Sequence, residues 1–251
     1  MQEPIIIANW KMQLGIAESQ ELAKQIASEA TDVVGTVVLC PTFAALSVVA
    51  EVEAINSQIL LGAQDCYFET KGTFTSATSP AVLAELGCKY VIVGHSDRRY
   101  LFGDTNDVIQ KKMRAVALNG MTPVLCVGET AEERKQGQSE DVVMEQLKTA
   151  LADFPVDQPC IITYEPVWAI SHGTPHVVIK EEVEPLRVLI AAYLRETNRV
   201  APVIYGGSVV VDNVQSLVGP SAFAGALVGG ASLTAKDFLG ILANVRKLYA
   251  V

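Results

Sequence analysis

The sequence predicts an α/β protein built as a (β/α)8 barrel, and three observations support this prediction. Short β-rich apolar runs recur along the 251 residues, segments with helical periodicity separate them, and the chain has the length of one barrel. Strands that alternate with helices run parallel and are joined by right-handed crossovers. Eight such units in about 250 residues is the size at which a parallel sheet closes on itself.

Eight apolar runs are interpreted as strands. They cover residues 5–8, 36–39, 59–63, 90–93, 122–127, 160–164, 203–205 and 226–228. Apolar residues spaced by three and four predict helices between the strands. The clearest helical patterns are Leu22-Ala23-Ile26-Ala27-Ala30, Val143-Met144-Leu147-Ala150-Leu151 and Phe238-Ile241-Leu242-Val245-Leu248. No linker rich in Pro, Gly or Ser divides the chain, so residues 1–251 are expected to form a single barrel domain.

The alternative architecture is an open, doubly wound parallel sheet. Such a sheet usually carries G-x-G-x-x-G after its first strand, whereas Asn9-Trp10-Lys11-Met12 follows the first run here. A barrel predicts instead that polar residues and glycines of interest follow several different strands. They do so at Asn9 and Lys11, Gln64, His95, Gly128 and Glu129, Glu165, Gly206-Gly207-Ser208, and Gly229-Gly230. The barrel is therefore favoured.

Composition limits the possible partners and the cellular location. The net charge of −9 and the pI of about 4.9 argue against nucleic acids and anionic membranes as partners. The first residues carry no basic region, and no apolar run approaches the roughly 18 residues of a membrane span. A soluble, cytoplasmic protein is expected. Five widely spaced cysteines without a C-x-x-C pair, and only three histidines, predict buried reduced thiols and no metal site.

Glu165 is the candidate base. It follows a buried strand and precedes Pro166 and four apolar residues, so its carboxylate is expected in a site from which water can be excluded. His95 ends another strand, and Ser96 is predicted as the N-cap of the helix that follows. Because the positive end of that helix disfavours an imidazolium, a neutral His95 is expected to donate a hydrogen bond.

Together with Lys11, these residues fit proton abstraction next to a carbonyl. Glu165 would take the proton, His95 would polarise the carbonyl, and Lys11 would stabilise the developing enediolate. Return of the proton to the neighbouring carbon interconverts an aldose and a ketose without a cofactor. Backbone N–H groups at Gly206-Gly207-Ser208 and at Gly229-Gly230-Ala231-Ser232 are suited to hold a phosphate. A small sugar phosphate is therefore the expected substrate.

Six motifs are spread from one end of the chain to the other. They are Ala8-Asn9-Trp10-Lys11-Met12, Gly94-His95-Ser96 with Arg98-Arg99, Cys126-Val127-Gly128-Glu129, Tyr164-Glu165-Pro166-Val167-Trp168-Ala169-Ile170, Tyr205-Gly206-Gly207-Ser208 and Leu227-Val228-Gly229-Gly230-Ala231-Ser232-Leu233. In order and spacing, these motifs resemble those of the triosephosphate isomerase family. The resemblance implies a TIM barrel that interconverts D-glyceraldehyde 3-phosphate and dihydroxyacetone phosphate in glycolysis and gluconeogenesis, with no cofactor and no metal.

The resemblance also implies roles for individual residues. The catalytic residues would be Asn9, Lys11, His95 and Glu165. Phosphate would be held by backbone N–H groups near Ser171, Ser208 and Gly230, in a site that includes Leu227 and Gly229. The supporting residues would be Asp97, Cys126, Glu129, Trp168, Ile170 and Tyr205.

A lid at residues 166–176 would close over the substrate and exclude water. Trp168 would reach Glu129 in one state of the lid, and Tyr205 with Ser208 would latch the other state. Ile170 and Leu227 would cover the base, and Cys126 would support the catalytic loop. These roles likewise come from the resemblance.

The lid departs from the family pattern. Residues 171–176 read Ser-His-Gly-Thr-Pro-His where the family usually reads Gly-Thr-Gly-Lys-Thr-Ala. A side chain at Ser171 restricts the backbone, and Pro175 fixes its own φ and pushes Thr174 toward extended conformations. The equilibrium between open and closed lid is therefore expected to differ from that of relatives.

Two further departures concern charged positions. Asp97 replaces a Glu that the family places close to the catalytic lysine, which leaves its partner undefined. A homodimer is implied through the loop around Thr75, which resembles the family's interdigitating loop. However, Ala77 stands where a Glu commonly pairs across the interface with the residue matching Arg98. The strength of the dimer therefore stays open.

Two other functions remain in competition. One is a sugar-phosphate isomerase with a longer substrate, which Ile170 and Leu227 oppose because they leave little room beyond a triose. The other is a catalytically silent barrel that binds triose phosphates or protein partners; intact Lys11, His95 and Glu165 argue against it. The charged run at residues 132–135 is interpreted as a solvated helix face.

Overall fold

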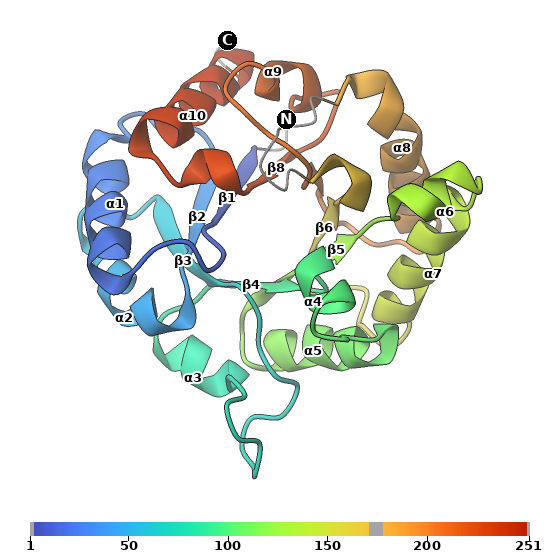
Figure 1. The fold of residues 1–251 in the computed structure, drawn as a ribbon, viewed down its shortest axis with the longest axis horizontal. Coiled ribbons are helices and arrows are strands. Elements are labelled where there is room, and N and C mark those ends of the chain that lie inside the picture. The colour runs from blue at the N-terminus through green and yellow to red at the C-terminus, as the bar shows by residue number, and fades with distance from the viewer. Residues whose placement is uncertain (1–2, 171–177, 250–251) are drawn as a thin grey trace.

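The computed structural model describes residues 3–170 and 178–249, and its strands form a closed parallel barrel (Figure 1). The strands are β1 (Ile5–Asn9), β2 (Thr36–Cys40), β3 (Ile59–Ala63), β4 (Tyr90–Val93), β5 (Thr122–Val127), β6 (Ile161–Tyr164), β7 (Val203–Tyr205) and β8 (Gly225–Val228). Each strand pairs with its neighbours in chain order, and β8 closes the sheet against β1. The predicted (β/α)8 barrel is therefore confirmed, and the open doubly wound sheet is wrong.

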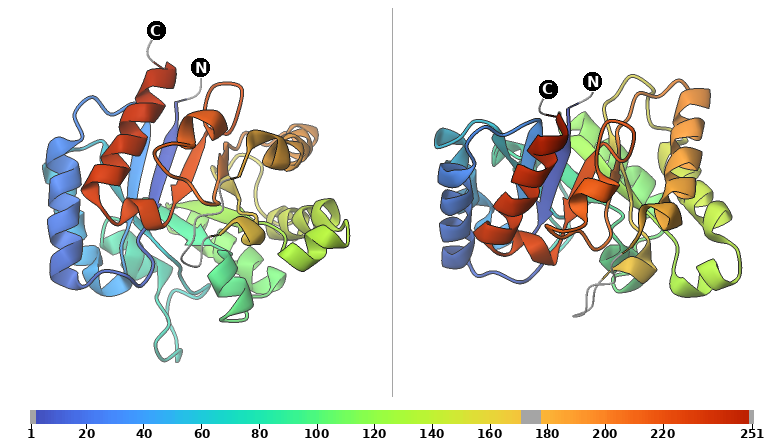
Figure 2. Two further views of the ribbon diagram at one scale, coloured as in Figure 1. Left: turned by 45° about the horizontal axis from the view of Figure 1, so that its top comes forward. Right: turned by 90° about the horizontal axis from the view of Figure 1, so that it is seen from above.

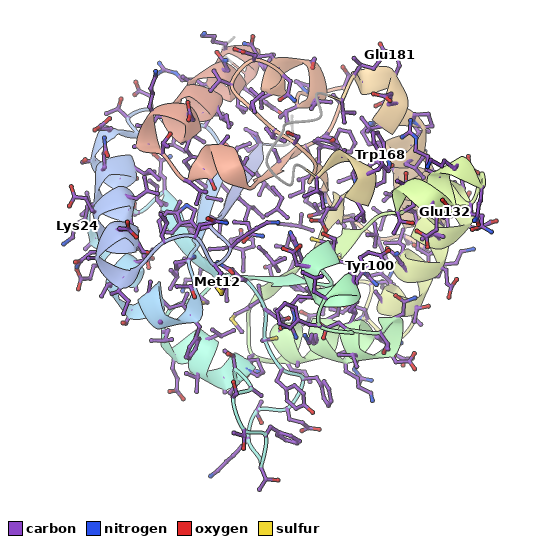
Figure 3. All side chains as sticks on the ribbon, viewed as in Figure 1. Met12, Lys24, Tyr100, Glu132, Trp168 and Glu181 are labelled. Carbon is purple, nitrogen blue, oxygen red and sulfur yellow. The ribbon has the colours of Figure 1, made fainter. Side chains whose placement is uncertain are left out.

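Helices surround the barrel on its outside (Figures 1 and 2). They are α1 (Ile16–Glu29), α2 (Leu46–Val49), α3 (Pro80–Glu85), α4 (Ser96–Tyr100), α5 (Asn106–Leu118), α6 (Ala131–Lys135), α7 (Ser139–Leu151), α8 (Lys180–Glu196), α9 (Val214–Leu217) and α10 (Ala235–Tyr249). Short 3-10 turns are η1 (Phe43–Ala45), η2 (Ala50–Ala54), η3 (Val167–Ala169) and η4 (Gly230–Ser232). Charged residues such as Lys24, Glu132 and Glu181 lie on the outer helices (Figure 3). No helix in the described ranges is long and apolar enough to cross a membrane.

Strand residues separate into two apolar clusters because successive side chains point to opposite faces of the sheet. Ile6 and Ala8 of β1 pack with the buried faces of the helices, whereas Ile7 belongs to a smaller cluster. That cluster gathers side chains from several strands, namely Ile7, Val38, Cys40, Ile92, Val124, Cys126, Ile161, Ile204 and Leu227. We assign this cluster to the barrel interior, which it fills below the C-terminal ends of the strands.

The seam between β8 and β1 depends on a glycine. A Cβ atom at Gly225 would lie 1.9 Å from the carbonyl oxygen of Ile5, its register partner in β1. No side chain fits at that distance, so only glycine lets the last strand approach the first closely enough to pair.

The cysteines are buried and unpaired, as the sequence predicts. Burial raises the pKa of the thiols of Cys66 and Cys88 to about 12 and that of Cys160 to about 11. These side chains therefore remain neutral thiols at physiological pH and act as small apolar residues of the core.

Candidate active site

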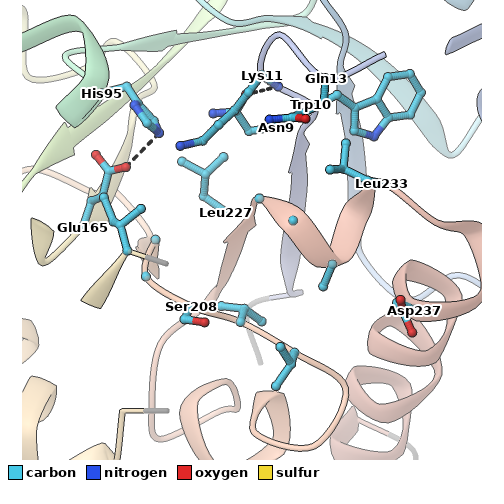
Figure 4. A pocket seen from close by; sticks show the side chains of 18 of the residues that line it. Asn9, Trp10, Lys11, Gln13, His95, Glu165, Ser208, Leu227, Leu233 and Asp237 are labelled. Atoms are coloured by element: carbon cyan, nitrogen blue, oxygen red, sulfur yellow. Dashed lines mark hydrogen bonds and ion pairs between the residues drawn. The ribbon is translucent and has the colours of Figure 1, made fainter. Parts of the chain in front are cut away.

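Glu165 lies just beyond β6, and only 3% of its surface is exposed. Its Oε1 is 2.9 Å from Nε2 of His95 (Figure 4). Its Oε2 accepts a hydrogen bond from the backbone N–H of Ser96 at 3.0 Å. The Ser96 hydroxyl donates to Oε1 at 3.3 Å. Both oxygens of this buried carboxylate are thus satisfied by donors from one short segment after β4.

The protonation of His95 follows from its partners. The backbone N–H of Asp97 donates to Nδ1 of His95 at 3.1 Å, so Nδ1 is an acceptor without a proton. A neutral imidazole then carries its proton on Nε2, the atom that faces Glu165. The structure therefore presents His95 as a donor toward the site.

The predicted N-cap at Ser96 is wrong, because His95 occupies the N-cap position of α4. Nδ1 of the imidazole accepts the N–H of Asp97, which is the bond that a serine hydroxyl would otherwise make. Ser96 becomes the first helical residue, and its hydroxyl is available to Glu165. Sequence analysis missed this role of Ser96, since an N-cap preference does not specify which of two adjacent residues fills the position.

Lys11 lies just beyond β1 with a φ of 51°, a left-handed conformation that a residue with a side chain rarely adopts. Its backbone N–H donates to Oδ1 of Asn9 at 3.1 Å, and its carbonyl accepts from Nε2 of Gln64 at 2.8 Å. These two bonds hold the strained turn in place. The side chain of Lys11 extends toward the His95–Glu165 pair (Figure 4).

Asp97 contacts Lys11. Its Oδ2 lies 3.0 Å from Nζ of Lys11, and both side chains are about one third exposed. The carboxylate, although one methylene shorter than a glutamate, reaches the ammonium from the first turn of α4. Lys11 is thus oriented by the helix that also carries His95 at its N-terminus.

Two glycines allow Glu165 to reach this position. A Cβ at Gly128 would lie 1.9 Å from the carbonyl oxygen of Glu165, and a Cβ at Gly206 would lie 2.5 Å from Cγ2 of Thr163. The peptide group between Tyr164 and Glu165 is hydrogen-bonded on both sides. The N–H of Glu165 donates to the carbonyl of Val127, and the N–H of Gly206 donates to the carbonyl of Tyr164. The sequence predicts that these glycines follow strands, but it does not predict how closely they approach Glu165 and Thr163.

Glu129 forms a second buried polar centre beside the first residues of the expected lid. It accepts hydrogen bonds from Nε1 of Trp168 at 2.9 Å and from the hydroxyl of Tyr164 at 3.1 Å. The guanidinium of Arg134 lies 3.8 Å above the Trp168 ring and pairs with Glu182 at 3.3 Å. The interpretation of residues 132–135 as a solvated face is therefore wrong for Arg134, and the role of Tyr164 was not foreseen.

Cys126 and Tyr205 are the remaining supporting candidates. Cys126 lies in the barrel interior, where burial raises the pKa of its thiol well above the usual range, so it packs as a neutral group near Glu165. The Tyr205 hydroxyl is buried, and no hydrogen-bond partner for it is found within the part of the chain that the structure describes.

The opposite side of the site is built from backbone. Ser208, Leu227, Gly229 and Gly230 line the same cavity of about 590 Å³ as Asn9, Lys11, His95, Glu165 and Ile170. The amides of Ser208 and Gly230 make no backbone hydrogen bond to any described residue. Unused donors at the start of the 3-10 turn η4 suit an anion. The cavity therefore joins the polar side chains at one end to free N–H groups at the other.

Asn213 shapes this end of the cavity, a role that sequence analysis missed. Its Oδ1 accepts from the N–H of Val210 at 2.9 Å, and its Nδ2 donates to the carbonyl of Ser208 at 2.8 Å. The side chain therefore fixes the turn that presents the amide of Ser208. No local pattern signals this role, because Oδ1 of Asn213 accepts from a residue three positions earlier, whereas the side chain of an Asx turn bonds the backbone two residues on.

The sequence model of the triosephosphate isomerase family matches residues 4–245 of this chain. The chain belongs to the triosephosphate isomerase family. A triosephosphate isomerase of Roseiflexus sp. (strain RS-1) is 43% identical over 250 residues, covering 96% of this chain and 97% of that protein. The triosephosphate isomerase of Thermoanaerobacter pseudethanolicus (strain ATCC 33223 / 39E) is 40% identical over 247 residues, covering 96% and 99%. The crystal structure of triosephosphate isomerase from Bartonella henselae has a TM-score of 0.87 at 33% identity, covering 98% of this chain and all of that one.

Some predicted features of a triosephosphate isomerase site fall outside the described residues. The departures at Ser171, Thr174 and Pro175 lie there, as does most of the lid at residues 166–176. Its described part begins with Pro166 and η3 and ends at Ile170, which lines the cavity.

Proposed function

We propose that Glu165 moves a proton between the first two carbons of a triose phosphate, with His95, Lys11 and Asn9 as the other catalytic residues. The chain interconverts D-glyceraldehyde 3-phosphate and dihydroxyacetone phosphate, the aldose–ketose isomerisation of its family and a step of glycolysis. The observation that carries the assignment of residues is the 2.9 Å contact between Glu165 and Nε2 of His95 at the bottom of the cavity.

The reaction needs a base and a donor on the same side of the substrate. Glu165 removes a proton from C1 of dihydroxyacetone phosphate, and the electron pair moves onto the C2 oxygen to form an enediolate. His95 donates from Nε2 to that oxygen, and Lys11 supplies positive charge nearby. His95 gives its Nε2 proton to the C2 oxygen and takes the proton of the C1 hydroxyl, so that C1 becomes a carbonyl as Glu165 returns its proton to C2. The product is D-glyceraldehyde 3-phosphate, and the enzyme ends unchanged.

The substrate-free contacts of Glu165 cannot persist through this reaction. Nε2 of His95 has a single proton, which it shares with Oε1 of Glu165 in the described state. To polarise a carbonyl, His95 must exchange that acceptor for the substrate oxygen. Oε1 of Glu165 then loses this hydrogen-bond partner and becomes available to accept the substrate proton.

The phosphate is proposed to lie at the backbone end of the cavity, near the amides of Ser208 and Gly230 with Gly229 and Leu227 beside it. Because the net charge of −9 repels an anion over long range, local N–H donors must supply the affinity. The backbone of Ser171 and closure of residues 166–176 are proposed to complete the site, with Tyr205 and Ser208 as latch residues and Ile170 with Leu227 covering the base.

A homodimer formed around Thr75 is also proposed, in a cytoplasmic enzyme. Residues 64–79 project from the barrel between β3 and α3 (Figures 1 and 2). Phe74 in this loop is 42% exposed, and Met12, next to Lys11, is 92% exposed. Apolar side chains at such exposure favour burial against a second copy. Arg98 pairs with Asp65 of its own chain at 3.1 Å. Its charge is therefore compensated without a carboxylate at position 77 of a second copy.

The experiment is a coupled assay with purified protein and with Glu165→Gln, followed in deuterated water. The amide keeps the size of the side chain but cannot accept a proton, so both isomerisation and deuterium exchange at C1 should fall by about 10²- to 10⁴-fold. Unchanged exchange would reject Glu165 as base. A folded wild-type protein that binds the triose phosphate but shows no turnover would support the silent barrel instead.

A further inference from the structure

The two consecutive arginines of α4 have opposite surroundings. Arg98 faces the carboxylates of Asp65 at 3.1 Å and Asp104 at 3.2 Å. Arg99 points to the other side of the helix, where its three acceptors among the described residues are uncharged. Its Nε donates to Gly94 O at 2.7 Å, its Nη1 to Asn106 Oδ1 at 2.7 Å, and its Nη2 to Cys126 O at 2.9 Å.

The contacts of Arg99 join the strand ends that carry the active site. Gly94 directly precedes His95, and its φ of 74° makes the turn from β4 into α4. Cys126 belongs to β5, whose next residue, Val127, accepts the backbone N–H of Glu165 at 2.8 Å. One planar guanidinium therefore fixes the His95 turn relative to the strand that bonds the Glu165 peptide.

Arg99 also places a permanent positive charge behind the base. Desolvation lowers the pKa of its guanidinium, and this effect is partly opposed by other groups, among them Glu165 and Asp104. Arginine stays protonated even so. A cation that is largely removed from water and has only carbonyl and amide oxygens as acceptors is weakly screened, so its field reaches the nearby carboxylate.

We propose that Arg99 is a positioning residue of the isomerisation. Its hydrogen bonds hold the His95 turn against β5, and its partly buried charge attracts the carboxylate of Glu165. The inference rests on the assignment of Glu165 as the base. It extends that assignment, because Arg99 does not line the substrate cavity and acts through two residues that do.

The other groups around Glu165 cannot replace this charge. From β4 the base is faced by His95, whose Nδ1 accepts the N–H of Asp97 and lies 3.5 Å from the Asp97 carboxylate. From β5 it is faced by Cys126, a neutral thiol because burial raises its pKa. Lys11, beyond β1, is paired with Asp97. Around Arg99 itself, Tyr100 is neutral because desolvation raises the pKa of its phenol.

The test compares Arg99→Met, Arg99→Lys and Asn106→Ala by kcat, KM and the pH profile of kcat/KM. Arg99→Met loses both the hydrogen bonds and the charge, so kcat should fall by about 10²-fold while KM stays nearly constant. Removal of a cation makes ionisation of the base harder, so the acid limb of kcat/KM should move to higher pH.

Arg99→Lys keeps the positive charge but loses the planar guanidinium, whose Nε, Nη1 and Nη2 donate to three acceptors. Its kcat should fall roughly tenfold, the effect of one lost charged hydrogen bond, and its acid limb should stay where the wild type has it. Asn106→Ala is the matched control, because Arg99 retains its charge and both carbonyl acceptors. Both kcat and the acid limb of Asn106→Ala should be close to wild type, although its melting temperature should drop.

The three variants separate positioning from general stability. Wild-type kcat and acid limb in folded Arg99→Met would overturn the proposal, as would an equal loss of kcat in Asn106→Ala. If Arg99→Met does not fold, a wild-type kcat in Arg99→Lys overturns the positioning part. Glu165→Gln in the same assay keeps the two claims apart: if that variant is fully active, the assignment of the base fails, whatever Arg99 does.

Discussion

The two sides of the cavity are built by different means. On the side of β1, β4 and β6, the site is formed by side chains that contact one another. Glu165 is hydrogen-bonded by Ser96 and His95, and Lys11 is paired with Asp97. On the side of β7 and β8, glycines line the cavity, and the N–H groups of Ser208 and Gly230 make no backbone hydrogen bond to any residue that the structure describes. The first side is held by hydrogen bonds and ion pairs within the chain, whereas we propose that an anion completes the second. Chemistry should therefore be most sensitive to the first side and binding to the second.

The largest expected effect comes from the side-chain half. His95→Gln replaces the imidazole that donates from Nε2 and caps α4 through Nδ1. Without a donor in the right place for the developing oxyanion, kcat should fall by about 10²- to 10³-fold, with KM changed little. Steady-state kinetics of the folded variant measure this. A variant that loses affinity but keeps kcat would contradict the division between the two sides.

The backbone half should respond in KM. At Gly230 an added Cβ meets no atom within 4 Å, so Gly230→Ala should fold normally. Alanine keeps the N–H, but its methyl group should crowd the proposed phosphate position, and the weaker charge-assisted hydrogen bond should raise KM about tenfold. Titration with inorganic phosphate as a competitive inhibitor should show the same loss. A fall in kcat at constant KM would place the phosphate elsewhere.

The lid sequence offers a smaller effect. Replacing residues 171–176 by Gly-Thr-Gly-Lys-Thr-Ala restores the usual family pattern, including Gly in place of Ser171 and Thr in place of Pro175. If the present sequence closes less completely, the replacement should reduce the methylglyoxal released per turnover, because the enediolate would be better sequestered. The ratio of methylglyoxal to isomer is the measurement. An unchanged ratio would reject a role for these departures.

The ion pair of Arg187 and Glu184, neither of which lines the cavity, gives a control for effects on stability alone. The Arg187 side chain hydrogen-bonds Glu184 on α8, with its Nε 2.7 Å from Oε2, and lowers the pKa of that carboxyl. A lowered pKa stabilises the fold above the carboxyl's unfolded pKa, and the benefit is lost as pH falls through its native pKa. Glu184→Gln should therefore cost about 0.5 kcal/mol at neutral pH and almost nothing in acid, with kcat and KM unchanged. Urea unfolding at both pH values tests this; an equal cost in acid would argue against an ionic origin.

The sequence predicts the barrel and the ends of its strands well. Apolar runs and helical spacing are local patterns, and the polar residues that follow each run identify Lys11, His95 and Glu165 as neighbours once the sheet closes. Contacts that join distant segments were not predictable in this way. The bonds from Ser96 to Glu165 span 69 residues, and that from Tyr164 to Glu129 spans 35. No local periodicity encodes such pairs.

Arg134 and Gly128 illustrate the same limit. A charged residue in a polar run usually faces water, and only the fold places Trp168 beneath the guanidinium of Arg134. A glycine after a strand signals a turn, but its contact with the carbonyl of Glu165 depends on the twist of two adjacent strands. The local sequence pattern identifies which residues are candidates for a function, whereas the fold determines the contacts that each of them makes.

Closure of the sheet by its first and last strands also has a consequence for synthesis on the ribosome. Until Gly225 emerges, a nascent chain that has formed the other strands exposes two unpaired edges, on β1 and β7. The slowest contact to form is then the one with the greatest sequence separation. Chains truncated before Gly225 should aggregate through those edges, because the barrel cannot close without β8.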